Sequence, residues 1–130
     1  MIIPPGFATI TVYFIVRDAA RFIEFLEDGL GGEEVLRSMR GTTIANAQVR
    51  IGNTTVMVAE KSQQYPAMCG AFYLYVDNAV TAMERALNHG AQLEMEVSDM
   101  SYGDRQGGVR DEWGNVWWIS QRLVDEPYSV

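Results

Sequence analysis

The chain has 130 residues, of which 48% are hydrophobic, and 17 acidic against 10 basic residues give it a net charge of -7. This composition suits one globular domain with a substantial core, and the acidic surplus argues against nucleic acid and membrane surfaces as partners. Cys69 alone allows no internal disulfide, and neither a secretion signal nor an apolar run of ~20 residues is visible, so we expect a cytoplasmic protein.

The first half of the chain predicts one strand, one helix and three further strands. Thr9–Val16 is β-branched and aromatic almost throughout, as in a strand covered on both faces. An apolar stripe at helical spacing runs through Ala19–Leu30, with Asp18 in position to cap the helix. The three strands that follow are expected over Glu33–Arg40, Ile44–Ile51 and Thr54–Glu60.

The second half repeats this order. Ala71–Val76 reads as a strand, and Asn78 then caps a helix over Ala79–Asn88. Three more strands are expected over Gln92–Val97, Gln106–Arg110 and Val116–Gln121. Identity between the halves is slight, so the order and spacing of elements carry the inference of a duplication, and the alternative is an α+β chain that only looks repetitive.

The most distinctive stretch joins a glycine-rich segment to an aromatic final strand. Asp111–Asn115 is an acceptable hairpin connection, and Trp117 and Trp118 follow it directly. Adjacent side chains on a strand point to opposite faces, so one tryptophan enters the core and the other a second apolar space, either a pocket or an interface.

Together, the paired modules and the run Tyr102–Asp111 before an aromatic strand resemble the vicinal oxygen chelate superfamily, above all its PhnB-like branch. That superfamily includes glyoxalase I, bleomycin-resistance proteins and extradiol dioxygenases. The resemblance implies an α+β fold within one domain of residues 1–130, with modules of about residues 7–62 and 70–122. It also implies curled mixed sheets that form a cleft, helices on the outer side and a homodimer.

Metal enzymes of the superfamily take ligands from the first and last strands of each module. Here the corresponding positions fall on Thr11, Met57, Ala71 and Trp118. Because none of these side chains is a usual donor to a divalent ion, we expect neither a metal nor another cofactor. A slipped strand could bring in Glu60, whereas the single histidine, His89, is expected to bond the last carbonyls of its helix.

Strand alternation then assigns the side chains that face the cleft. Arg105 and Arg110 are added as groups that could grip a carboxylate or phosphate, although such arginines more often brace loops. The predicted ligand-binding set is Thr11, Tyr13, Ile15, Met57, Tyr73, Tyr75, Arg105, Arg110 and Trp118, with no catalytic residue. Alternatively, these side chains fill one another's space or a dimer interface.

Two classes of function fit this sequence. The first is a metal-free binding protein, similar to bleomycin-resistance proteins, that sequesters an aromatic or cationic drug or metabolite. The missing metal ligands, the aromatic cleft and the acidic surplus favour it. The second is an enzyme, either a glyoxalase-type lyase or isomerase with a displaced metal or a metal-free relative that uses a tyrosine or an arginine.

Overall fold

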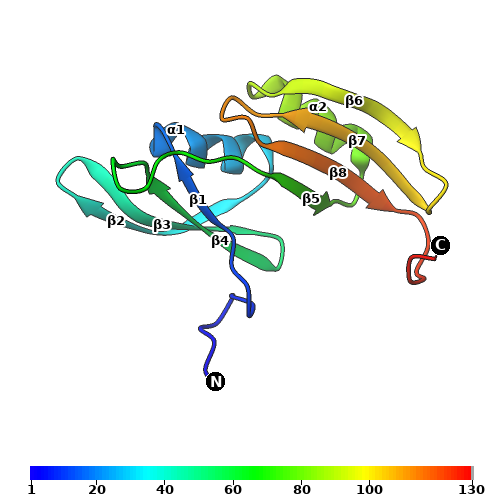
Figure 1. Ribbon diagram of the computed structural model, residues 1–130. Coiled ribbons are helices and arrows are strands. Elements are labelled where there is room, and N and C mark those ends of the chain that lie inside the picture. Colours follow the sequence, from blue (N-terminus) through cyan, green and yellow to red (C-terminus); the bar gives the residue numbers. More distant parts are fainter. Residues whose placement is uncertain (130) are drawn as a thin grey trace. The chain divides into compact units, whose positions relative to one another are not determined.

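The computed structural model describes residues 1–129, and its contacts divide the chain into two compact units, Met1–Cys69 and Gly70–Val130. Each unit contains a strand, a helix and three further strands (Figure 1), so the predicted α+β modules are confirmed. The first unit contains β1 (Tyr13–Val16), α1 (Ala19–Glu24), the π-helical turn η1 (Phe25–Gly29), β2 (Glu33–Arg40), β3 (Thr43–Ile51) and β4 (Thr54–Glu60). The second unit contains β5 (Ala71–Tyr75), α2 (Ala79–Asn88), β6 (Gln92–Asp99), β7 (Asp104–Arg110) and β8 (Val116–Arg122).

The first unit forms a mixed sheet in the order β1-β4-β3-β2, with β1 parallel to β4 and the other neighbours antiparallel. Alternate residues of β1 point to opposite faces. Phe14 and Val16 are buried on the side of α1, where the ring centroids of Phe14 and Phe22 lie 5.0 Å apart. Tyr13 and Ile15 therefore lie on the face that is turned away from the unit's own helix, which we call the distal face of the first unit.

The second unit repeats this sheet in the order β5-β8-β7-β6, with β5 parallel to β8. Trp117 is 4% exposed, and its ring centroid lies 4.9 Å from that of Phe72. The α2 side of the sheet is marked by Gly107, where a Cβ atom would meet the Met83 side chain of α2. Trp117 shares this side, as predicted, so Trp118 lies on the distal face of the second unit.

The two helices begin differently from one another. Asp18 has a φ of 54° and makes no side-chain capping bond, so its predicted role was wrong. Instead, the Glu60 carboxylate at the end of β4 accepts hydrogen bonds of 2.9 Å from the backbone N–H groups of Asp18 and Ala19. A left-handed backbone at Asp18 turns its own side chain away from the helix start, and a carboxylate from the neighbouring strand takes over.

Helix α2 has the cap that the sequence predicts, because Asn78 Oδ1 accepts from the Thr81 N–H at 3.1 Å. At this helix too a side chain from the last strand assists, since Gln121 Oε1 accepts from the Ala79 N–H at 3.0 Å. At the other end, His89 Nδ1 lies 2.8 Å from the Arg85 carbonyl oxygen, which agrees with the predicted contact to the last turn.

The helix predicted over Ala19–Leu30 is an α-helix only to Glu24 and a π-helical turn over Phe25–Gly29, and strand β1 is shorter than predicted. It starts at Tyr13 rather than Thr9, because its ladder with β4 begins where Tyr13 pairs with Met57. One bond precedes that ladder, from the Met57 N–H to the Val12 carbonyl at 3.0 Å. β-propensity alone cannot show where a partner strand begins.

Over residues 1–129, the structure has no helix that is both long enough and apolar enough to cross a membrane.

Candidate functional site

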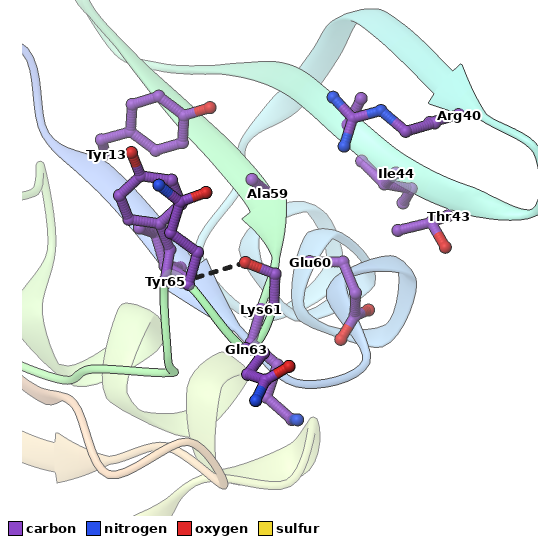
Figure 2. A pocket seen from close by; sticks show the side chains of 13 residues that line it. Tyr13, Arg40, Thr43, Ile44, Ala59, Glu60, Lys61, Gln63 and Tyr65 are labelled. Carbon is purple, nitrogen blue, oxygen red and sulfur yellow. Dashed lines mark hydrogen bonds between the residues drawn. The ribbon is translucent and has the colours of Figure 1, made fainter.

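The distal face of the first unit contains a pocket of about 660 Å³. Tyr13 and Ile15 of β1 line it, and the segment after β4 closes it through residues such as Tyr65. Figure 2 shows Tyr13 and Tyr65 on one side of this pocket and Arg40, Thr43 and Ile44 on the other. The Tyr13 hydroxyl accepts a 3.1 Å hydrogen bond from Asn46 Nδ2, which orients the ring.

The charged side chains that line this pocket differ in whether the protein itself supplies their partners. Glu60 lines it, but both of its oxygens are bonded to the start of α1. Arg40 and Lys61 also line it, and neither forms an ion pair within residues 1–129. The pocket therefore combines aromatic walls with two cations that are free to meet a ligand or solvent.

Thr11 and Met57 lie in a second hollow of the same unit. This groove of about 540 Å³ runs between the N-terminal segment, from Met1 to Thr9, and the side chains of Thr11, Gln48 and Met57. The four residues predicted for the first module thus divide between two hollows, Tyr13 and Ile15 in the first and Thr11 and Met57 in the second.

On the distal face of the second unit, Trp118 is the largest side chain. It pairs with Tyr73 on β5 and with Gly108 on β7. A Cβ atom at Gly108 would lie 2.6 Å from Trp118 Cζ3, so the indole ring rests directly on the β7 backbone. Tyr73 and Tyr75 continue this surface along β5, with ring centroids 5.1 Å apart and exposures of 43% and 56%. Glycine at position 108 is what lets the ring lie flat here.

A buried carboxylate lies on the same face. Asp104, at the start of β7, has an exposure of 0%. Its Oδ2 accepts hydrogen bonds from the hydroxyls of Tyr73 at 2.5 Å and Ser120 at 3.0 Å. Arg122 Nη1 donates to Oδ1 at 2.9 Å, and the Tyr128 hydroxyl donates to Oδ2 at 2.7 Å. Four donors therefore satisfy one carboxylate, which explains how it can be buried.

These contacts fix the protonation states of the cluster. Burial by itself would raise the pKa of Asp104, but the hydrogen bonds from its four donors outweigh that effect and lower the pKa to about 2. Burial and the hydrogen bond to Asp104 raise the pKa of Tyr73 to about 12. The pKa of Tyr128 is raised as well, first by its bond with Tyr75 and then by burial and Asp104. At neutral pH the carboxylate is ionised and both phenols are neutral donors.

Tyr128 comes from the segment after β8, and several groups hold it. Its hydroxyl lies 2.7 Å from that of Tyr75, and the guanidinium carbon of Arg122 lies 4.1 Å from its ring centroid. The Tyr102 ring contacts it edge-on at 6.3 Å, and the Tyr102 hydroxyl itself donates to Gln106 Oε1. Arg122 Nη2 also donates to the Glu126 carbonyl at 2.7 Å, which ties this tail to β8.

The two arginines predicted for the site do not join this cluster. Arg105 pairs with Gln121 in the ladder, so it points to the α2 side, and its Nε donates to Asp99 at 2.7 Å. Arg110 shares the face of Trp118, but its guanidinium makes two hydrogen bonds to Glu94, at 3.2 and 3.1 Å. Each arginine thus pairs across the β6–β7 ladder rather than with the aspartate next to it in sequence.

Asp111, the neighbour of Arg110, organises the β7–β8 turn. Its Oδ1 accepts from the N–H groups of Trp113 and Asn115 at 2.9 Å, and its Oδ2 accepts from Trp117 Nε1 at 2.9 Å. These bonds close the predicted hairpin and fix the ring of Trp117 in the core.

Comparison with known proteins identifies the family. The family model of the glyoxalase/bleomycin resistance protein/dioxygenase superfamily matches residues 7–119. This chain belongs to that superfamily. The uncharacterized protein Mb0911c of Mycobacterium bovis is 30% identical over 125 aligned positions, which cover 84% of this chain and 80% of that protein.

Two solved structures of the superfamily fold extend the comparison. TioX from Micromonospora sp. ML1 matches with a TM-score of 0.77 at 24% identity, over 90% of this chain and 99% of that one. TnmS3, an antibiotic binding protein from Streptomyces sp. CB03234, matches with a TM-score of 0.67 at 18% identity, over 88% of this chain and 97% of that one. At these identities the likeness shows the fold.

The divalent ion used by enzymes of the superfamily does not fit the residues present. No group of three or more His, Cys, Asp or Glu side chains in residues 1–129 is placed to hold an ion. Met57 and Trp118 stand at matching positions, paired with Tyr13 and Tyr73, and neither offers a usual ligand. Glu60, the candidate from a slipped strand, is bonded to backbone N–H groups instead.

The Asp104 cluster is the part of the site that sequence reasoning missed. The strand predicted over Gln106–Arg110 begins two residues after Asp104, so the prediction assigns Asp104 to no face of the sheet. Strand parity would have placed Asp104 beside Ser120 and Trp118, because it lies two and four positions from Gln106 and Gly108 on β7. No periodic pattern would have placed Tyr128, which lies outside the strands and helices.

Proposed function

We propose that this chain is a small-molecule binding protein that sequesters an aromatic, neutral or cationic drug or metabolite on the distal faces of its sheets without a metal ion. One observation carries the proposal. Trp118 lies on the distal face, rests on Gly108 and stands where related enzymes hold a metal ligand, so a stacking surface replaces a coordinating group.

The neighbouring side chains support an aromatic ligand. Tyr73 and Tyr75 extend the surface of Trp118, and both rings are about half exposed. In the first unit, Tyr13 and Tyr65 line a pocket whose volume falls within the range of small-molecule sites. The aromatic rings supply apolar contact area, and the tyrosine hydroxyls can orient a polar group of the ligand.

TnmS3, whose fold this chain shares, is an antibiotic binding protein, which supports the proposal. A net charge of -7 would attract a cationic ligand from solution, although the contacts in the site would decide its affinity. We therefore propose that the ligand is a flat organic molecule of the antibiotic or secondary-metabolite type.

The same residues give little support to the alternative that the protein is an enzyme. A metal-free mechanism would need a tyrosine or an arginine as acid or base. Burial and the hydrogen bond to Asp104 raise the pKa of Tyr73 to about 12, so its hydroxyl stays protonated near neutral pH and gives up its proton less readily than an ordinary tyrosine. Arg105 and Arg110 are each paired with a carboxylate.

We further propose that the protein is a homodimer, as the family resemblance implies, and that it is cytoplasmic, in keeping with its single cysteine. Edge strand β2 presents exposed apolar side chains at Val35, Leu36 and Met39, which suits contact with another subunit. Light scattering of the purified protein across a concentration series tests the dimer, and a stable monomer at every concentration would remove it.

The function is tested by titrating the purified chain with a panel of aromatic antibiotics and metabolites and following tryptophan fluorescence. We expect saturable quenching by at least one flat aromatic compound and none by aliphatic compounds of similar size. Elemental analysis of the same sample should find no stoichiometric divalent metal. A stoichiometric metal together with lyase or isomerase activity would favour the glyoxalase-type alternative.

A further inference from the structure

We propose that Tyr128 is a built-in occupant of a phenol-binding site at Asp104, and that a ligand with a neutral phenolic hydroxyl displaces it. This inference rests on the proposed small-molecule function and names the chemical group that the site recognises. It assigns the C-terminal tail, residues 123–129, a role as a tethered competitor of the ligand.

The origin of the four donors to Asp104 makes one of them removable. Tyr73 lies on β5, and Ser120 and Arg122 lie on β8, so the sheet fixes all three. Tyr128 belongs to a segment without helix or strand and is 50% exposed, yet its hydroxyl donates to the same carboxylate at 2.7 Å. The tail can therefore leave without breaking a ladder.

The carboxylate decides what can take the place of Tyr128. Asp104 is buried while Tyr128 is in place, so the departing hydroxyl has to be replaced by another donor, either water or a group of the ligand. A replacement has to donate a hydrogen bond, which a phenol does and an ether or a carboxylate does not. The Tyr75 hydroxyl, 2.7 Å from that of Tyr128, offers a second partner to the same group.

The surroundings of the Tyr128 ring suit an aromatic ligand as well. Arg122 holds its guanidinium carbon 4.1 Å from the ring centroid, a distance at which any aromatic ring gains a cation–π contact. Tyr73 and Trp118 pair in adjacent strands, so the aromatic surface continues from the cluster along the distal face. A ligand with a phenol at one end and further rings could use both parts.

Calorimetric titration of the full chain with two matched probes tests this assignment. 2-Naphthol carries a phenolic hydroxyl on two fused rings, and 2-methoxynaphthalene is its methyl ether. Tyr128→Ala removes the competitor, Tyr128→Phe keeps the ring but removes the donor, and Ser129→Ala is the control in the same tail.

We expect 2-naphthol to bind Tyr128→Ala about tenfold or more tightly than the wild type, the factor that one hydrogen bond to a charged group provides. For the same reason, Tyr128→Ala should bind 2-naphthol about tenfold more tightly than it binds 2-methoxynaphthalene. The affinity of Tyr128→Phe for 2-naphthol should lie between those of the wild type and Tyr128→Ala. The affinity of Ser129→Ala should match that of the wild type. Equal affinities for phenol and ether in Tyr128→Ala, or equal affinities in wild type and Tyr128→Ala, would overturn the proposal.

Fluorine NMR of the chain labelled with 3-fluorotyrosine provides a second readout, because binding and release of the tail are reciprocally linked. The signal that Tyr128→Phe removes belongs to Tyr128. Adding 2-naphthol should move that signal to the position of an exposed tyrosine, and a signal that stays in place at saturation would contradict displacement.

The two proposals can fail separately. If aromatic compounds quench the tryptophans but neither probe distinguishes the Tyr128 variants, the phenol site is wrong and the binding function stands. If no aromatic compound binds the wild type or Tyr128→Ala, the binding function itself is wrong.

Discussion

The sheets of the two units share a strand order, β1-β4-β3-β2 and β5-β8-β7-β6, but their distal faces are built on opposite plans. In the first unit, Arg40 and Lys61 line a pocket without forming an ion pair within the described residues. In the second, Asp104 is buried under four hydrogen-bond donors and one of them comes from the tail. The first face therefore leaves two cations without an ion pair, whereas the second satisfies its buried carboxylate with groups of the chain itself.

What the units keep in common lies on the helix side. Glu60 is the last residue of β4 and Gln121 the last but one of β8, and each accepts a hydrogen bond from the first N–H of its helix, at Ala19 and Ala79. The repeated framework therefore fixes where the helices dock, while the distal faces are free to differ. A duplicated backbone predicts positions and does not predict chemistry.

The largest expected effect is a difference in stability between substitutions on the two faces of β8. Trp117→Ala should cost about 3 to 5 kcal/mol of unfolding free energy, since it empties a core site and leaves Asp111 without one donor. Trp118→Ala should cost clearly less, because the ring rests on the distal face. Denaturant melts of both variants measure the difference, and a larger loss for Trp118→Ala would reverse the two faces.

The Asp104 cluster should give the second unit a distinct dependence on pH. The folded pKa of about 2 lies below the ordinary value of 3.8, so this stabilisation is complete above pH 4 and is lost as the pH falls towards 2. The loss should amount to about 2 kcal/mol and should be absent in Asp104→Asn, which does not titrate.

At the alkaline side the sign is opposite. The folded pKa of Tyr73 is raised from 10.0 to about 12, so stability is complete below pH 10 and falls as the pH rises towards 12. Tyr73→Phe should make that limb shallower, and Tyr128, whose pKa is raised as well, should retain part of it. Urea melts at a series of pH values measure both limbs, and a profile that is the same in the wild type and both variants would contradict the cluster.

A smaller effect tests the shared helix starts. Glu60→Ala should cost about 1 to 2 kcal/mol, because two backbone N–H groups lose their acceptor, and Gln121→Ala about 1 kcal/mol or less, because one does. Glu60→Gln retains one acceptor oxygen and should fall between Glu60→Ala and the wild type. Thermal melts measure the order of these stability losses. If only Gln121→Ala lowered the stability, Glu60 would not be a cap.

The smallest effect concerns metal ions, for which we expect no change. Zinc, nickel and manganese should leave the melting temperature where it is, since an ion that bound the native state would raise it by mass action. A dose-dependent rise with one of these ions that Glu60→Gln abolishes would show that Glu60 is a ligand rather than a cap.

Sequence alone predicted the framework well, for physical reasons. The helix α2 and the strands β2 and β4 have the predicted bounds, because a capping residue or a glycine turn marks where each begins. The placement of Trp117 and Trp118 on opposite faces follows from alternation alone. Local periodicity carries this information without any knowledge of partners.

The remaining features depend on contacts between distant parts of the chain. Glu60 reaches the start of α1 only because β4 lies beside β1, and Asp18 gave no sign of its left-handed backbone. Tyr128 meets Asp104 through a tail without periodic structure. Such contacts arise from tertiary pairing, which residue patterns do not encode by themselves.

The most direct test of the binding function is a calorimetric titration of Trp118→Ala with the aromatic ligand found by quenching. Trp113→Ala, in the β7–β8 turn, is the matched control. Because Trp118 supplies the stacking surface, its removal should weaken binding by about 1 to 3 kcal/mol, while the control stays close to the wild type. An unchanged affinity in a folded Trp118→Ala protein would contradict the claim that the distal face of the second unit binds the ligand.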